Sequence, residues 1–131
     1  MVVLISNNRA KKKVLLPGAG LGRLAYDVAN LGFQSQGNEF SLYMLFASNY
    51  ILNQCKYKNC STVYPWVHQT CNNVASEDVT RPSKFPDLDP CLSADSNFSM
   101  IAGDFLEVYQ DAAYANSFDV STVEYHNFNY V

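Results

Sequence analysis

The stretch "VLLPGAGLGRLA", Val14 to Ala25, decides the fold because three glycines separate an apolar run from a helix-like run. An apolar run that ends at turn-forming residues is typical of a buried parallel strand, here over 13–16. After the glycines, apolar residues recur at three- and four-residue spacing, which predicts a helix with one buried face and Gly32 as its C-terminal cap. The residues of that expected face are Leu21, Leu24, Ala25, Val28, Ala29 and Leu31.

The next segment, "FQSQGNE", predicts a second short strand that ends near Glu39. Strand, glycine loop, helix and strand form a βαβ unit, whose crossover should be right-handed. Ser41 is the expected N-cap of a second helix over 42–55. Apolar side chains surround most of this helix, so we expect it to be heavily buried, with Met44 and Phe46 in the core.

The rest of the chain predicts a third strand over 98–105 that ends at Asp104, a short helical stretch, and a fourth strand that starts over 118–123. We therefore expect an α/β fold with a parallel sheet, flanking helices and an incomplete sheet, as one partial domain over 1–131. Its expected parts are a βαβα cofactor-binding unit over 13–54, a family-specific insertion over 55–97, and a C-terminal part over 98–131 with the third strand, a helix and the start of the fourth strand.

The segment from Cys55 to Asp95 is rich in proline, asparagine and serine and shows little periodicity. A segment of this length is unusual as a plain connection, so we interpret it as a functional insertion or lid. Within it, "YPWVHQ" predicts a compact aromatic knot. We expect His68 in that knot to pack and form hydrogen bonds rather than to act as a catalytic base.

Composition narrows the function classes. The 131 residues carry a net charge of −3, which speaks against a nucleic-acid-binding surface, and no apolar run is long enough to span a membrane. The cysteines lack the spacing of a zinc site, so we expect no metal, free thiols and a soluble cytoplasmic protein, with the nucleus as a second compartment. The four cysteines are Cys55, Cys60, Cys71 and Cys91.

The spacing of the glycines indicates which class of cofactor the loop can bind. Its pattern is Gly18-x-Gly20-x-Gly22, and Arg23 stands where the dinucleotide fingerprint G-x-G-x-x-G has its third glycine. This disfavours a nicotinamide-binding domain and fits better the S-adenosylmethionine loop of the common methyltransferases. In either case, glycine permits the sharp strand-to-helix turn and lets the backbone approach the ligand.

Two acids follow at later strand ends. Glu39 lies 17 residues after Gly22, where a carboxylate can accept both ribose hydroxyls. Asp104 could meet the adenine edge, with Phe105 against the ring face. Taken singly, Glu39 could be a solvated strand-end acid and Asp104 a helix N-cap. Together with the glycine loop they predict a cofactor site at the carboxyl edge of the sheet.

Four segments together, "VLLPGAGLGRLAYDVANLGFQSQGNEFSLYMLFASNYILN", "YPWVHQTCNN", "RPSKFPDLDP" and "SNFSMIAGDF", closely resemble the carnosine N-methyltransferase family over roughly 13–120. The resemblance implies a class I methyltransferase fold, S-adenosylmethionine as methyl donor, and an imidazole nitrogen of carnosine, or of a related histidine-containing dipeptide, as acceptor, giving anserine from carnosine. It places Gly18 in the cofactor loop, Glu39 on the ribose, and Asp104 with Phe105 on the adenosyl part.

The chain also departs from the family. The family has an upstream helical region that we expect this chain to lack, and "STVEYHNFNYV" after the fourth strand does not match the family's substrate-contacting motif. His126 and Asn127 echo only the last letters of that motif, so neither receives a role. We therefore expect a family member truncated at both ends, with no catalytic or substrate residue assigned. The alternative is an inactive cofactor-binding fragment or interaction module, and self-association through an exposed sheet edge is expected in either case.

Overall fold

The computed structural model describes residues 8–69, 71, 73–90 and 97–122. These residues fall into two compact units, one formed by 1–48 with 92–131 and the other by 49–91. The elements are η1 (Arg9–Lys11), β1 (Lys13–Pro17), α1 (Arg23–Asn30), β2 (Gln34–Glu39), α2 (Leu42–Asn53), β3 (Ser61–Val63), η2 (Ser76–Thr80), β4 (Ser83–Phe85), β5 (Phe98–Ala102), α3 (Phe105–Tyr109), η3 (Ala112–Tyr114) and β6 (Val120–Ser121).

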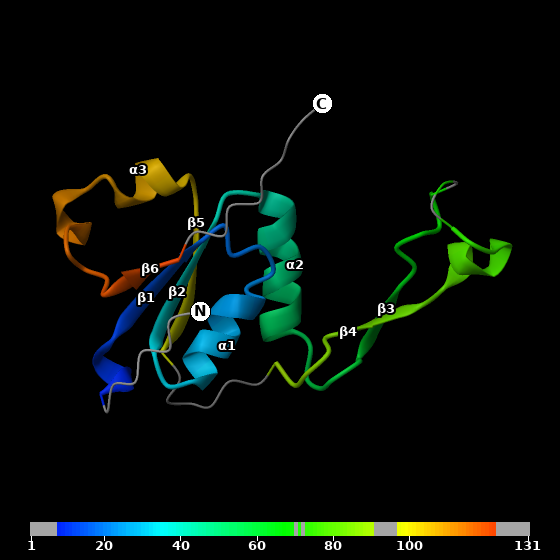
Figure 1. The fold of residues 1–131 in the computed structure, drawn as a ribbon, viewed down its shortest axis with the longest axis horizontal. Coiled ribbons are helices and arrows are strands. Elements are labelled where there is room, and N and C mark those ends of the chain that lie inside the picture. The colour runs from blue at the N-terminus through cyan, green and yellow to red at the C-terminus, as the bar shows by residue number, and fades with distance from the viewer. Residues whose placement is uncertain (1–7, 70, 72, 91–96, 123–131) are drawn as a thin grey trace. The chain divides into compact units, whose positions relative to one another are not determined.

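The first unit is built on a four-stranded parallel sheet with the order β5-β2-β1-β6 (Figure 1). β1 pairs with β2 with Leu15 opposite Gln36, and β2 pairs with β5 with Glu39 opposite Ala102. The chain adds β2 and β5 on one side of β1 and then crosses to place β6 on the other side. The predicted α/β fold is confirmed, and the strand order reverses beside β1, where ligands bind in sheets of this kind.

α1 covers one face of this sheet. Val14 and Leu16 of β1 form the core with Ala25 of α1, which is completely buried. The helix begins only at Arg23 and buries the small residues Ala25 and Ala29, which let its backbone lie close to the sheet. The prediction of this buried face is therefore wrong in part, because three of its leucines are exposed. One precedes the helix, one lies in its first turn and one follows its last residue. Their exposed fractions are 42% for Leu21, 48% for Leu24 and 58% for Leu31.

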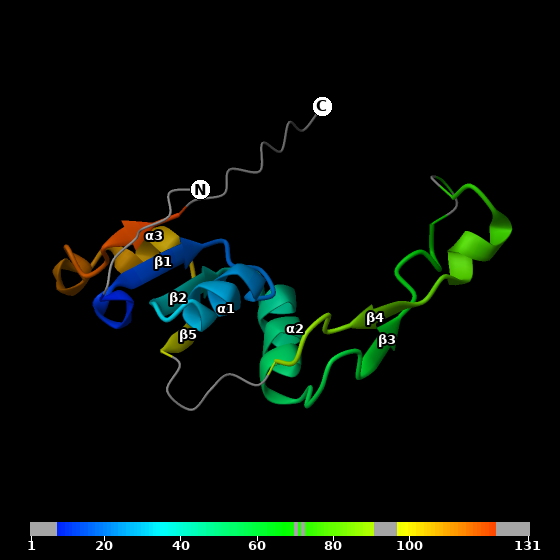
Figure 2. The same cartoon turned by 60° about the horizontal axis from the view of Figure 1, so that its bottom comes forward.

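The opposite face of the sheet carries the connection between β5 and β6, and Figure 2 shows α3 and α1 on the two sides of the strands. The Tyr109 hydroxyl donates a hydrogen bond to Oε1 of Gln36 at 3.1 Å. The rings of Tyr114 and Phe118 meet the Tyr109 ring edge-on, at centroid distances of 5.0 and 5.8 Å. Burial, and then the neighbouring Tyr114, raise the pKa of Tyr109. A short helix and an aromatic cluster thus take the place of a long crossover helix.

α2 differs from the expectation. Ser41 directly precedes the helix, as predicted, and its carbonyl accepts a hydrogen bond from the Leu45 N–H at 3.0 Å. The prediction of heavy burial is wrong, since Ser48 is the only buried residue of the helix. Met44 and Phe46, expected in the core, are 45% and 70% exposed. An all-round apolar sequence favours burial, but too few of the described residues pack on this helix to cover it.

The second unit, 49–91, contains an antiparallel pair of short strands, β3 and β4, and the 3-10 helix η2 (Figure 1). The expected aromatic knot is open: Tyr64 is 52% exposed, and His68 is exposed rather than packed. The guanidinium of Arg81 lies over the Trp66 ring, 5.6 Å from its centroid. This ring therefore makes a cation–π contact where the sequence predicted packing against aromatic side chains. A lid function for this segment stays a prediction.

At the C-terminal end, β6 covers two residues, a shorter strand than the predicted 118–123. Val123 lies outside the described residues, as do Cys91, His126 and Asn127. Among the residues that the structure describes, no helix has both the length and the apolar character needed to cross a lipid bilayer.

Candidate cofactor site

The three expected strand ends come together at one edge of the sheet. Pro17 at the end of β1 pairs with Asn38 of β2, and Glu39 pairs with Ala102 at the end of β5. Because the strands are parallel and in register, the loops that follow them leave the sheet side by side. The glycine loop, the residues after Glu39, and the turn at Gly103 therefore surround the same edge.

The glycine loop has the backbone that its sequence predicts. Gly18, Gly20 and Gly22 have φ values of 69°, 56° and 85°, in the left-handed region where a side chain is strained. A Cβ atom built on Gly18 or Gly20 would meet no other atom within 4 Å. At these two positions, glycine is thus required by the turn and leaves open space in front of the backbone.

Glu39 is attached to this loop. Its Oε2 accepts a hydrogen bond from the Gly20 N–H at 2.8 Å. Its Oε1 accepts hydrogen bonds from the N–H groups of Phe40 and Ser41 at 2.9 and 2.8 Å. These three donors hold the carboxylate at the rim between the glycine loop and the start of α2. Glu39 is therefore more than a solvated acid at a strand end.

Asn38 is a site residue that the sequence analysis did not identify. It is 2% exposed, and its side-chain amide donates hydrogen bonds to the carbonyls of Ile101 and Gly103 at 3.3 and 3.0 Å. The backbone carbonyl of Asn38 accepts a hydrogen bond from the Ala19 N–H at 3.0 Å. Asn38 thus connects the glycine loop to the end of β5. Its position beside Glu39 in "QGNE" is the signal that could have identified it.

Gly37 has a different role from the loop glycines. A Cβ atom at this position would lie 2.9 Å from the Cβ of Ala19 and would also collide with the side chain of Met100. The absence of a side chain lets the glycine loop lie directly on β2. The close approach of these two segments brings Gly20 within reach of Glu39.

Asp104 lies at the end of the turn after β5, and the N–H of its neighbour Gly103 donates to the Glu39 carbonyl at 3.0 Å. Its Oδ1 accepts hydrogen bonds from the N–H groups of Leu106 and Glu107 at 2.8 and 3.3 Å, so Asp104 is the N-cap of α3. The Phe105 ring is 37% exposed and lies 5.2 Å from the ring of Tyr109. A contact of either residue with an adenosyl group stays a prediction.

Arg23, in the place of a third glycine, is the first residue of α1. Its Nε donates to both carboxylate oxygens of Asp27, at 3.1 and 2.9 Å, one helical turn away. Both side chains are about half exposed, so this ion pair contributes little to stability. The Arg23 side chain therefore extends along the surface of α1 toward Asp27.

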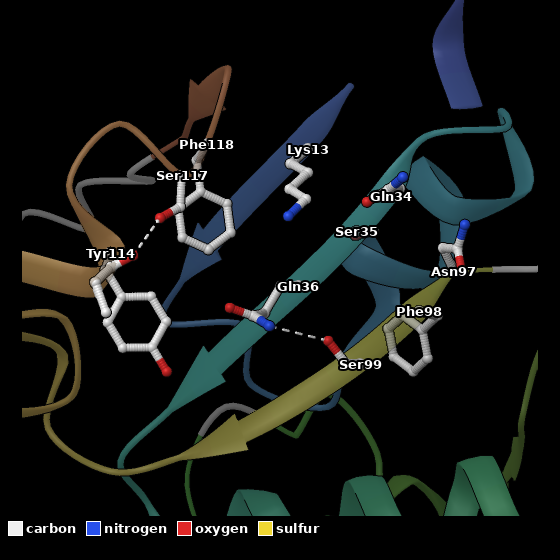
Figure 3. A pocket seen from close by; sticks show the side chains of 11 residues that line it. Lys13, Gln34, Ser35, Gln36, Asn97, Phe98, Ser99, Tyr114, Ser117 and Phe118 are labelled. Carbon is white, nitrogen blue, oxygen red and sulfur yellow. Dashed lines mark hydrogen bonds between the residues drawn. The ribbon is translucent and has the colours of Figure 1, made fainter. Parts of the chain in front are cut away.

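The pocket shown in Figure 3 lies elsewhere. It is lined by the amino-terminal parts of the strands, with Lys13, Gln34 and Gln36, and by Tyr114 and Phe118 from the connection to β6. Ligands of parallel sheets bind at the opposite, carboxyl edge, so we do not assign this pocket to the cofactor. Within the described part of the chain, no group of three or more His, Cys, Asp or Glu side chains is placed to hold a metal ion.

Comparison with known proteins identifies the family to which the chain is similar. A family profile described as carnosine N-methyltransferase matches residues 2–127. The carnosine N-methyltransferase of Mus musculus is 55% identical over 103 residues, which is 78% of this chain and 26% of the mouse protein. The Drosophila melanogaster protein, carnosine N-methyltransferase unmet, is 52% identical over 75% of this chain and 22% of its own length.

The Schizosaccharomyces pombe carnosine N-methyltransferase is 50% identical over 88% of this chain and 31% of its own length. The chain thus spans about a quarter of the curated relatives that it matches. The profile match over 2–127 includes the glycine loop, the strand that ends in Glu39 and the strand that precedes Asp104, which are the segments that form the candidate site. The parallel sheet, the site at its carboxyl edge and the profile match together show that the chain belongs to the carnosine N-methyltransferase family.

Proposed function

We propose that this chain forms the S-adenosylmethionine-binding part of a methyltransferase that methylates an imidazole nitrogen of carnosine or a related histidine-containing dipeptide. The hydrogen bond from Gly20 to Glu39 carries the proposal, because it joins the loop and the acid that the cofactor requires. The family match and the open space before Gly18 and Gly20 support it. The acceptor is inferred from the names of the relatives.

The described residues fit such a cofactor. The three N–H donors use three of the about four lone-pair sites of the Glu39 carboxylate, which leaves one site on Oε2 to accept a hydrogen bond from a ribose hydroxyl. The open backbone at Gly18 and Gly20 allows a close approach of the ligand. Asp104 and the half-exposed face of Phe105 are the proposed contacts of the adenine. When bound, the cofactor supplies an electrophilic methyl group on a sulfonium centre.

The protein's contribution to such a reaction is mainly positioning. An imidazole nitrogen is a competent nucleophile in its neutral form, which predominates at pH 7 because its pKa is about 6.5. No described residue is assigned as a catalytic base. The alternative function, a cofactor-binding fragment without activity, shares the same site and differs only in turnover.

The proposal is tested by calorimetric titration of the purified protein with S-adenosylhomocysteine, the demethylated cofactor. We expect saturable binding and a loss of affinity of at least about tenfold in Glu39→Ala, because a hydrogen bond to a charged acceptor contributes about 1.5–3 kcal/mol. Glu77→Ala, which removes an exposed acid of η2, is the matched control and should bind normally.

Circular dichroism of each variant separates loss of the site from loss of the fold, and Glu39→Gln, which keeps the shape of the side chain, is the second variant. A folded wild-type protein that binds NAD, or that binds neither ligand, would contradict the cofactor assignment. Incubation with S-adenosylmethionine and carnosine, followed by mass spectrometry, separates the two functions. A methylated dipeptide supports the enzyme, and binding without product supports the inactive fragment.

A further inference from the structure

Two cysteines of the second unit interact within a short turn. Cys55, just beyond α2, is 5% exposed, whereas Cys60, at the start of β3, is partly exposed. Asn59 between them has a φ of 58°, which folds the chain back on itself. The turn is held from outside as well. The Lys58 N–H donates to Oδ1 of Asp89 at 2.8 Å, and the Asn59 N–H donates to the carbonyl of Pro86 at 2.7 Å.

A chain of polar side chains extends from the thiols. The Cys60 sulfur lies 3.7 Å from Oγ of Ser61, and this Oγ lies 2.7 Å from the hydroxyl of Tyr50. The pKa shifts of the two thiols also reflect an interaction between the side chains of Cys55 and Cys60. One sulfur is therefore buried and the other is reachable from solvent, with hydrogen-bond donors around the reachable one.

The same contacts make the two thiols chemically unequal. A hydrogen bond from Cys55 lowers the pKa of Cys60, and hydrogen bonds from Ser61 and from the backbone of Tyr57 and Lys56 lower it further, against an opposing effect of burial. Burial raises the pKa of Cys55, and the hydrogen bond to Cys60 adds to this. Because the thiolate is the nucleophile, Cys60 reacts first and Cys55 is the resolving cysteine.

We propose that Cys55 and Cys60 form an oxidative modification site, in which a hydroperoxide oxidises Cys60 and Cys55 then closes a disulfide between the end of α2 and the start of β3. The site is formed by residues of the second unit, and it does not depend on the proposed methyltransferase function.

The chemistry proceeds in two steps. The Cys60 thiolate attacks one peroxide oxygen; the O–O bond breaks, Cys60 becomes a sulfenic acid and hydroxide leaves, or alkoxide if the peroxide is organic. The Cys55 sulfur then attacks the Cys60 sulfur. The S–S bond forms, the S–O bond breaks, and the departing hydroxide takes the Cys55 proton to form water. Two sulfurs lose two electrons in total, and the hydroperoxide accepts them.

Tryptic peptide mapping of the purified protein tests the site. Lys56 and Lys58 lie between the two cysteines, so trypsin separates them unless a disulfide holds the peptides together. After treatment with a small excess of hydrogen peroxide, we expect a linked pair of peptides containing Cys55 and Cys60, which dithiothreitol separates. In Cys55→Ser, the sulfenic acid should persist at Cys60 and react with dimedone.

Cys71, which is exposed and lies outside this turn, is the internal control. Exposure alone would make Cys71 the faster thiol, whereas we expect Cys60 to react with iodoacetamide at least about fivefold faster at neutral pH. Cys71→Ser should leave the Cys55–Cys60 link unchanged. Equal or slower alkylation of Cys60, or a disulfide that pairs Cys60 with another cysteine, would overturn the proposal. The mapping uses the unmodified chain, so it remains decisive if a variant does not fold.

Discussion

At the scale of single residues, backbone N–H groups hold two carboxylates at the carboxyl edge of the sheet. Glu39 accepts three such hydrogen bonds and Asp104 accepts two. For Glu39, they connect the strand end to the glycine loop, so the residue is both a structural link and the proposed ribose acceptor. For Asp104, Oδ1 accepts both hydrogen bonds at the start of α3. The alternative that the sequence offered, a helix N-cap, is therefore confirmed.

A pair of variants separates the two roles of Asp104. Asp104→Ala should lower the free energy of unfolding by about 1 kcal/mol, because the N-cap is lost, whereas Asp104→Ser keeps a good cap and should be close to the wild type in urea unfolding. If the carboxylate also contacts the adenine, both variants should bind S-adenosylhomocysteine more weakly. Wild-type affinity in the serine variant would leave Asp104 as a cap only.

At the scale of elements, side-chain contacts compensate for the shortness of β6. Oδ1 of Asp119 lies 2.6 Å from Nζ of Lys12, and Oδ2 accepts the Lys13 N–H at 2.9 Å. The Asp119 N–H donates in turn to the carbonyl of Lys13 at 2.9 Å. One aspartate therefore attaches the start of β6 to the start of β1 and sets the register of the strand.

This contact predicts a pH dependence. The hydrogen bonds from Lys12 and from the Lys13 backbone lower the pKa of Asp119. A carboxyl whose pKa is lower in the folded state stabilises the fold fully above the unfolded pKa, and the stabilisation is lost as the pH falls through the lowered value. Asp119→Asn should therefore be less stable than the wild type in urea at about pH 7, and the difference should shrink as the pH falls through the lowered pKa of Asp119. A difference that is independent of pH would contradict this explanation.

At the scale of the whole molecule, the exposed apolar side chains of α2 and the β6 edge stand out. Among the described strands, β6 has a partner only in β1, and Tyr43 and Phe46 of α2 are 87% and 70% exposed. An open strand edge and a contiguous apolar surface both favour association with another surface. The mouse and rat members of the family are about three times as long as this chain.

We predict that this 131-residue chain associates with itself when it is purified alone. Sedimentation velocity at increasing concentration should show growth in mean mass, because apolar surface is removed from water on contact. The double variant Tyr43→Glu and Phe46→Glu should reduce the association if α2 is responsible. A chain that stays monomeric at all concentrations and unfolds sharply and reversibly on heating would contradict the prediction.

Local features of the sequence were sufficient for the parallel α/β fold and for placing the glycine loop and Glu39 at the same edge of the sheet. A glycine at a positive φ, an apolar run before it and an acid at the next strand end depend on near neighbours and on the right-handed crossover, which follow general rules. The parts that the sequence could not supply depend on distant partners. Asn38 is important because its amide reaches carbonyls 63 and 65 residues further along the chain.

The same physical reason explains the corrections. The spacing of Leu24 and Leu31 and the all-round apolar character of α2 indicate that surface should be buried, but burial requires a covering partner, and periodicity does not identify one. α1 instead uses Ala25 and Ala29 for its closest contact with the sheet. Backbone conformation and the succession of strands and helices thus follow from the sequence, because local sterics and chain connectivity determine them. Which apolar faces are covered, and which polar groups are paired, was decided only by tertiary packing.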